Sequence, residues 1–178
     1  LKGHLTGMLN KVKGYENQES YMERSLAVVE KMETLVKELL YVSKTDGKQR
    51  TEYKTIDFAE LLRVQIADVT DLLSEKEISL SVDIPDKILC DADPAQMERA
   101  IQNVLVNAIR YSPNGEAIYI SLSNDKNTVS CKVENTGVHI PKEMIPHLFE
   151  AFYRADTSRN RNTGGTGLGL YIVRKIME

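Results

Sequence analysis

Asn103, Asn107 and Arg110 are separated by four and three residues, so a helix through this segment places all three side chains on one face. Asparagine is unfavourable inside a helix because its amide competes for backbone hydrogen bonds. Two asparagines and an arginine on one face therefore indicate a polar surface that could face a ligand. A solvated stripe on an ordinary amphipathic helix is the alternative, and the spacing alone favours that alternative. The other faces of the segment are apolar, with Met97, Ile101, Val104, Leu105 and Ala108.

A glycine-rich segment at residues 164–169 contains four glycines in six residues, and an amphipathic pattern after it predicts a helix over 171–178. Backbone N–H groups at a helix N-terminus bind phosphate, and glycines let the backbone approach an anion closely. The segment is not a P-loop, since no Lys-Ser/Thr pair follows it. It is not a Rossmann turn either, since no apolar strand precedes it. We interpret it as a phosphate-binding loop rather than a plain flexible one.

Two further segments accompany the glycines. Residues 157–163 are polar, contain two arginines, and predict a lid that covers phosphate. Because few apolar side chains can hold residues 155–165, we expect them to be poorly ordered without nucleotide. A third motif, Val133–Pro141, places Asn135 and Gly137 after a predicted strand. By itself this motif is a common turn.

Composition excludes several classes of protein. The 178 residues carry 23 Lys and Arg against 26 Asp and Glu, a net charge of −3, which argues against nucleic-acid binding. Hydrophobic residues at 42% and charged residues at 28% are typical of an ordinary soluble protein. Apolar runs are short, so no transmembrane helix or signal peptide is predicted. Cys90 and Cys131 form no disulfide framework, and we expect both in the core.

The first part of the chain predicts a helical hairpin. Residues 1–14 and 20–45 repeat apolar residues at spacings near three and four, with a turn at 14–18 between them. Such a thin hairpin has too little core to stand alone, so we expect two copies to form a four-helix bundle. The apolar face of the longer helix consists of Met22, Leu26, Val29, Met32, Val36 and Leu39.

After a polar linker at residues 47–53, the pattern changes to mixed helix and strand. Helices are predicted from Asp57 to Leu72 and from Asp93 to Tyr111, each after a capping aspartate. Strands are predicted at 54–56, 78–84, 88–90, 117–123 and 128–134. The fold class that we expect is α+β: a hairpin at 1–46, then an α/β sandwich at 54–178 with helices on one face of a mixed sheet.

In order and spacing, the three motifs resemble the N, G1 and G2 boxes of the ATP-binding domain of sensor histidine kinases. Leu148–Arg154 is similar to the F box of that family, which lies between G1 and G2. The resemblance covers residues 54–178, and the hairpin resembles the end of the dimerisation and phosphotransfer domain. A narrower resemblance is to the sensors that control glycopeptide resistance. The resemblance implies a sandwich that binds ATP with Mg²⁺.

The resemblance also implies roles for single residues. Asn107 would be the Mg²⁺ ligand, since an amide oxygen suits a hard cation, and Asn103 would hold the phosphates or the waters of Mg²⁺. Arg110 would contact phosphate and share the catalytic role with Asn107, while Tyr111 would line the adenine pocket. The Asn135 amide oxygen would accept a hydrogen bond from the exocyclic amine of adenine. Further nucleotide contacts are implied for Gly137, Ile140, Arg154, Gly165, Thr166, Gly167, Leu168 and Gly169.

The sequence departs from the family pattern in two places. The G1 box usually reads Asp-x-Gly-x-Gly, but Asn135 offers an oxygen without a charge and His139 replaces the second glycine. The phosphoacceptor segment His-Glu/Asp-x-x-x-Pro does not occur in the 178 residues. We interpret His4 as a helix residue beyond the acceptor site and His147 as a surface residue. We therefore expect the chain to be a piece of a longer protein.

The resemblance implies a protein histidine kinase, which transfers the γ-phosphoryl of ATP to a histidine outside these residues and then to a response-regulator aspartate. It implies a homodimer through the N-terminal helices, a receiver-domain partner and no nucleic acid. The location implied is the cytoplasmic side of the cell membrane, with attachment only through segments absent here. An ATPase that activates water with a glutamate near position 103 is one alternative, against which Asn103 argues. A degenerate ATP-binding or scaffold module is the other, against which Asn107 and the glycine loop argue.

Overall fold

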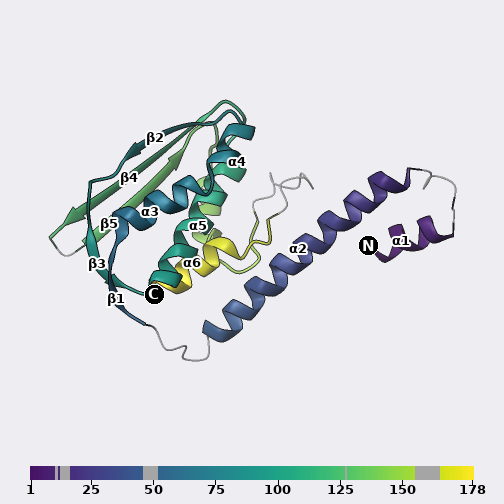
Figure 1. Cartoon of the computed structure of the whole chain (residues 1–178), viewed down its shortest axis with the longest axis horizontal. Coiled ribbons are helices and arrows are strands. Elements are labelled where there is room, and N and C mark those ends of the chain that lie inside the picture. Colours follow the sequence, from purple (N-terminus) through teal and green to yellow (C-terminus); the bar gives the residue numbers. More distant parts are fainter. Residues whose placement is uncertain (11, 13–16, 46–51, 127, 155–164) are drawn as a thin grey trace. The chain divides into compact units, whose positions relative to one another are not determined.

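The computed structural model describes residues 1–10, 12, 17–45, 52–126, 128–154 and 165–178. The chain forms two compact units, residues 1–49 and 50–178 (Figure 1). The described elements of the first unit are helices, and an α/β sandwich makes up the second unit, which confirms the α+β fold class. Residue 46 and residues 47–51 of the predicted linker lie outside the described residues, and the domain boundaries at 46 and 54 stay a prediction.

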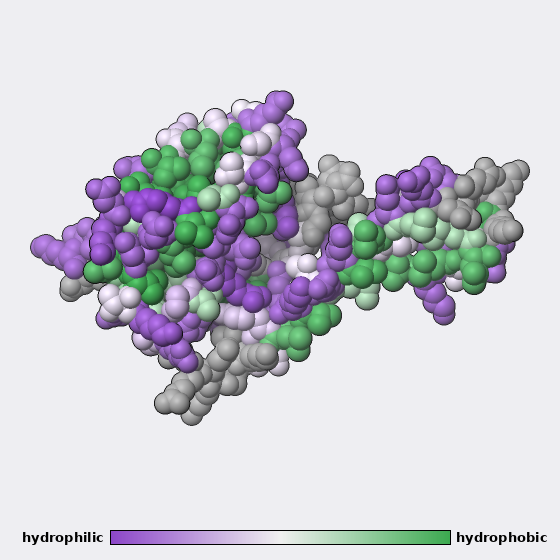
Figure 2. All heavy atoms as spheres, in the orientation of Figure 1, coloured by the Kyte–Doolittle hydropathy of each residue, from purple (hydrophilic) through white to green (hydrophobic). Residues whose placement is uncertain are grey.

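The first unit is a hairpin of α1 (Lys2–Leu9) and α2 (Gln18–Thr45). The rings of His4 and Tyr21 meet edge to face, with centroids 5.3 Å apart. In the described part of this unit only Gly7 and Ser25 are buried, so the hairpin has no apolar core of its own. None of the described helices combines the length and the hydropathy needed to cross a membrane. The apolar face is exposed, as Figure 2 shows for the hairpin, and includes Met22, Leu26, Val29, Met32, Val36 and Leu39.

A three-stranded sheet forms one layer of the second unit. The strand order is β2-β4-β5, in which β2 pairs parallel to β4, and β4 pairs antiparallel to β5. Ile118, Ile120 and Leu122 alternate along β4 and are buried under the helices, whereas Tyr119 between them is exposed. The strands of this sheet are β2 (Ser79–Asp83), β4 (Ala117–Asp125) and β5 (Thr128–Asn135).

Helices cover one face of this sheet (Figure 1). A separate antiparallel pair, β1 (Lys54–Asp57) and β3 (Leu89–Ala92), lies beside them. The Asp57 carboxylate accepts from the N–H of Ala59 at 3.2 Å, as expected of a cap. The helices of the second unit are α3 (Phe58–Ala67), α4 (Thr70–Glu75), α5 (Pro94–Tyr111) and α6 (Gly169–Met177), with the 3₁₀ helix η1 (Lys142–His147).

The central helix α5 begins and ends where the sequence predicts. The Asp93 carboxylate accepts hydrogen bonds from the backbone N–H groups of Ala95 and Gln96, at 3.1 and 3.2 Å. Burial opposes ionisation of Asp93, but the hydrogen bonds from Gln96, Glu52 and Ala95 outweigh it and lower the pKa of that carboxyl. The core-facing residues of the helix are Ala100, Ile101, Leu105, Ala108 and Ile109.

Two predicted helices have different bounds in the structure. The helix predicted from Asp57 to Leu72 is interrupted between α3 and α4, where the N–H of Val69 donates to the carbonyl of Ile66 three residues back, at 3.2 Å. This tighter turn lets Val69 enter the core with 6% of its surface exposed. Helix α6 begins at Gly169, two residues before the predicted start, because the N–H of Ile172 already closes a turn on the carbonyl of Leu168 at 2.8 Å.

The prediction that both cysteines lie in the core is wrong for Cys131, which is exposed on β5. Cys90 is half-buried and packs against the core. Cys131 is exposed because β5 is a border strand: within the described residues it pairs with β4 alone. Cys131 faces an open groove of about 240 Å³, whose wall it shares with Val133 of the same strand and Val104 of α5.

Candidate functional site

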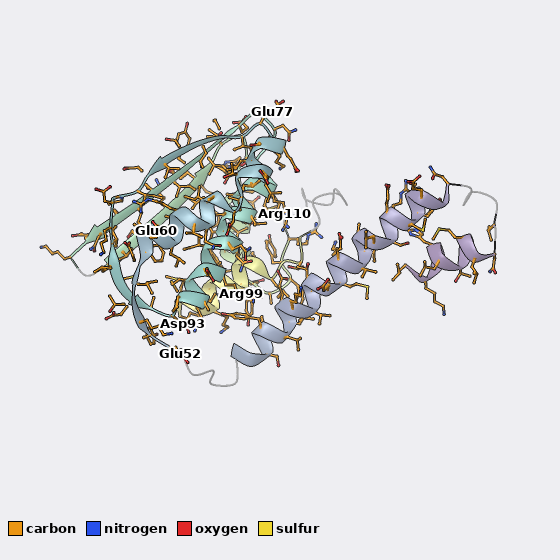
Figure 3. All side chains as sticks on the ribbon, viewed as in Figure 1. Glu52, Glu60, Glu77, Asp93, Arg99 and Arg110 are labelled. Carbon is orange, nitrogen blue, oxygen red and sulfur yellow. The ribbon has the colours of Figure 1, made fainter. Side chains whose placement is uncertain are left out.

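The polar stripe on α5 is half-buried along its whole length. Asn103, Asn107 and Arg110 each keep part of their surface exposed, while Leu105 and Ala108 on the other face are buried. Figure 3 shows Arg110 toward the C-terminal end of α5 and Asp93 at the opposite end. Half-burial argues against the simple solvated stripe, because such side chains lie against a neighbouring element.

Helix α6 is that neighbouring element at Asn103. A Cβ placed on Gly169, the first residue of α6, would lie only 3.2 Å from Oδ1 of Asn103. The glycine therefore allows the two helices to approach closely at this point. The N-cap residue of α6, Leu168, provides no side-chain hydrogen bond, and the first N–H groups of a helix have no partner within it. An amide side chain and the positive end of a helix thus lie together.

The glycine-rich loop is fixed to the F box by its backbone. The N–H of Phe152 donates to the carbonyl of Gly167 at 2.9 Å. Gly167 has φ +77°, and a Cβ there would lie 2.8 Å from the carbonyl carbon of Phe152. Phe152 itself adopts φ 65°, an uncommon conformation for a residue with a side chain. Both residues of this contact therefore hold special backbone conformations.

The burial of Leu168 also holds the loop in place. This side chain is only 1% exposed, and the side chain of Ile172 is fully buried. The backbone N–H of Leu168 donates to the hydroxyl of Thr166 at 3.2 Å. In this arrangement the N–H of Leu168 is used inside the loop rather than presented to a ligand. Gly165, the last residue of the predicted lid at 155–165, is buried, and the other residues of that lid, Gly164 included, lie outside the described residues.

The turn at the end of β5 is held by Glu116. The Thr136 hydroxyl donates to the Glu116 carboxylate at 2.6 Å and accepts from the N–H of Ala117 at 2.9 Å. Gly137 has φ +78°, and a Cβ there would lie 2.6 Å from the carboxyl carbon of Glu116. Asn135, half-buried, is paired with Ile118 of β4. These contacts join the turn to the segment that follows α5.

The remaining candidate residues are more scattered. Tyr111 is half-buried at the last position of α5, and Arg154 is half-buried at the end of the F box. Ile140 is 44% exposed, and His139 is exposed. His147 is exposed on η1, where Nδ1 lies 2.8 Å from the Glu150 carboxylate, as expected of a surface residue.

A metal ion at this site would need ligands in addition to those that the described residues offer. Within the described part of the chain, no cluster of three or more His, Cys, Asp or Glu could hold a metal. Asn107 offers a single amide oxygen. That set fits Mg²⁺, which often keeps several waters and takes oxygens from bound phosphates.

The chain is similar to known proteins of one family. Residues 92–178 match the family model described as histidine kinase-, DNA gyrase B-, and HSP90-like ATPase. The sensor histidine kinase CusS of Escherichia coli K12 is 32% identical over 171 residues, which is 95% of this chain and 35% of CusS. The chain belongs to the sensor histidine kinases. The chain spans about a third of the length of CusS and of the related probable sensor kinase SilS of Salmonella typhimurium.

The chain is also similar to a second curated sensor protein and to a solved histidine kinase structure. The sensor protein VanSC of Enterococcus gallinarum is 32% identical over 160 residues, which is 88% of this chain and 44% of VanSC. Among solved structures, the histidine kinase AdeS of Acinetobacter baumannii superposes with a TM-score of 0.79 at 25% identity, over 99% of this chain and 80% of that one. The similarity to AdeS thus includes both units of this chain.

Sequence reasoning missed two groups that shape the candidate site. One is the Glu116 carboxylate, which no motif singles out, since a glutamate before a strand is common. The other is the backbone of Phe152, whose contact with Gly167 lies across residues that are distant in sequence. The available signal was Gly167 itself, because a glycine at a fixed position in a loop can mark a close backbone approach.

Proposed function

We propose that the second unit binds ATP with Mg²⁺, and that the whole protein transfers the γ-phosphoryl of ATP to a histidine and then to a response-regulator aspartate. The observation that carries this proposal is the close approach of Asn103 to Gly169 at the start of α6, where an added Cβ would lie 3.2 Å from Oδ1 of Asn103. This approach brings the polar stripe of α5 next to the N-terminus of α6, the helix that follows the glycine-rich loop. Triphosphate recognition requires such a combination of N–H donors and positive potential.

Each residue of the stripe would have a distinct task. The N–H groups at the start of α6 would bind phosphate oxygens, and Asn103 beside them would orient the phosphates or a bound water. The Arg110 guanidinium would neutralise phosphate charge and hold the triphosphate in line with its acceptor. The Asn107 amide oxygen would ligate Mg²⁺, and the ion, when bound, supplies charge neutralisation at the transferred phosphoryl.

The adenine would lie near the C-terminal end of α5. Tyr111 ends that helix, and Asn135 ends β5. The Asn135 amide can accept from the exocyclic amine of adenine, and the turn at Gly137 would border the base. Arg154 and Ile140 would border the nucleotide from the segment that includes the F box. The loop residues Gly165, Thr166, Gly167, Leu168 and Gly169 would surround the phosphates.

The same residues argue against the two alternative functions, a water-activating ATPase and a scaffold. An ATPase that activates water needs a carboxylate near the γ-phosphate, and position 103 offers an amide that already packs against Gly169. A scaffold would not require the close approach of α5 and α6. We place the site on the cytoplasmic side of the membrane, where ATP is present. The glycopeptide-resistance branch stays a prediction, because CusS and VanSC are both 32% identical to this chain.

Phosphotransfer to an added acceptor tests the proposed activity. Incubated with γ-labelled ATP and Mg²⁺, the 178-residue chain is expected to stay unlabelled, because its residues contain no His-Glu/Asp-x-x-x-Pro segment. An added helical hairpin that carries this segment is expected to gain acid-labile label slowly. The same hairpin with its acceptor histidine replaced by glutamine is the control. Label on His4, or phosphate release without label on the hairpin, would contradict the proposal.

The homodimer is the second part of the proposal, and the exposed apolar face of α2 supports it. Leu26 and Val29 are 59% and 45% exposed, although both are apolar. The double substitution Leu26→Glu and Val29→Glu is expected to shift the chain to monomer in sedimentation, because it places four charges in the interface of a dimer. Ala27→Glu with Thr34→Glu adds the same charge at neighbouring positions outside the predicted apolar face and should leave the dimer intact. Unchanged sedimentation of the first variant would show that another surface pairs.

A further inference from the structure

The C-terminal end of α5 lacks part of its usual hydrogen bonding. In a continuing helix, the carbonyl of Ile109 would accept from the N–H of residue 113, but Pro113 has none. Ser112 leaves the helix with φ −73° and ψ 132°, so later N–H groups turn away as well. The carbonyl groups of the last turn therefore need a donor from elsewhere. Arg110 and Tyr111, two candidate nucleotide contacts, extend from this same turn.

Lys76, the residue that follows α4, supplies that donor. Its ammonium nitrogen lies 2.8 Å from the carbonyl oxygen of Ile109, 3.0 Å from that of Arg110 and 2.9 Å from that of Ser112. A lysine ammonium has three N–H donors, so these bonds use all of them. Its positive charge also lies at the negative end of the helix dipole, where it is stabilising.

Lys76 is itself held in place by the turn that ends α4. The N–H of Glu77 donates to the carbonyl of Ser74, and the N–H of Ile78 to that of Leu73, both at 3.0 Å. With Glu77 at φ 54°, these two bonds form the Schellman motif that ends many helices. Figure 3 shows Glu77 at this turn. The backbone of Lys76 is bonded as well, since its carbonyl accepts from the N–H of Gly115 at 3.0 Å.

We propose that Lys76 is a positioning residue for the nucleotide, acting through the backbone of Ile109–Ser112 on Arg110 and Tyr111. This inference rests on the proposed function, because the proposed nucleotide site gives these two side chains their task. One ammonium holds two carbonyl groups of the last turn of α5, those of Ile109 and Arg110, together with that of Ser112 at the C-cap. Without it, the turn would fray and the two side chains would lose their fixed origin. Lys76 does not touch the nucleotide.

Three variants test the inference by calorimetric titration with a non-hydrolysable ATP analogue and Mg²⁺. Lys76→Met keeps the length of the side chain without its donors and is expected to weaken binding roughly 10- to 100-fold, the range that misplaced binding groups produce. Lys76→Arg restores charged donors and should bind within about threefold of the unsubstituted chain. Lys87→Met, which removes an exposed lysine after β2, should leave binding unchanged.

A double-mutant cycle separates positioning from general destabilisation. In a background with Arg110→Ala and Tyr111→Ala, Lys76→Met should change the affinity less than about twofold, since the side chains that it positions are gone. An equal loss in both backgrounds would overturn the inference, as would full affinity of Lys76→Met in the intact background. If Lys76→Met does not fold, Lys76→Gln, which keeps amide donors without the charge, must show the same coupling. No binding by the unsubstituted chain would instead refute the nucleotide site itself.

Discussion

Asn107→Ala is expected to weaken the binding of Mg·ATP by about 100-fold, whereas metal-free adenosine should bind within about twofold of the unsubstituted chain. The proposed site has Asn107 as its one protein ligand for Mg²⁺, and the described residues offer no cluster of acidic or imidazole ligands to replace it. Loss of the amide oxygen would therefore remove the link between the ion and the protein. Adenosine lacks both phosphates and metal, so it does not use this oxygen.

The Asn107→Ala substitution should leave the fold of α5 intact, so a loss of binding can be assigned to the missing amide. Asn107 is half-buried on α5, and alanine is the best helix former, so the helix should persist. Gln102→Ala, an exposed position on the same helix, is the matched control for any change in helix stability. Calorimetric titration of each variant with Mg·ATP and with adenosine gives the comparison. Equal losses for both ligands would show that Asn107 supports the pocket as a whole and does not bind the metal.

The features that sequence reasoning predicted well are those with local causes. Helix α5 has the predicted bounds because Asp93 caps its start and Pro113 follows its end. The β4–β5 hairpin is where the alternating pattern predicts it, with each strand extended by one or two residues. Capping and periodicity involve residues within a few positions of one another. A pattern along the chain therefore contains them.

The features that sequence reasoning missed depend on distant segments. The break between α3 and α4 falls inside a continuous helical pattern, because the position of Val69 in the core decides it. Cys131 faces an open groove because of where β5 lies in the sheet, which alternation along one strand does not reveal. The three bonds of Lys76 join residues more than thirty positions apart. The predicted lid at 155–165 stays a prediction, since all but its last residue lie outside the described part.

Gly167→Ala is expected to destabilise the second unit by about 3 kcal/mol and to abolish measurable nucleotide binding. Two effects add at this position. A left-handed backbone costs a residue with a Cβ about 1–2 kcal/mol. The added Cβ would also lie 2.8 Å from the carbonyl carbon of Phe152, a backbone atom that cannot rotate away as a side chain can. To avoid this steric overlap the loop must move away from the F box. That movement breaks the hydrogen bond between the Phe152 N–H and the Gly167 carbonyl.

Gly115→Ala separates the two effects, because Gly115 has φ +78°, nearly the value of Gly167, and a Cβ there would meet nothing within 4 Å. Denaturant unfolding should therefore show only the backbone cost of about 1–2 kcal/mol for Gly115→Ala. The difference between the variants measures the close approach of the loop to Phe152, which overpacking data place at about 1–3 kcal/mol. If the two alanines cost the same, the F box does not hold the loop in solution. The phosphate-binding geometry would then have to be formed by the nucleotide itself.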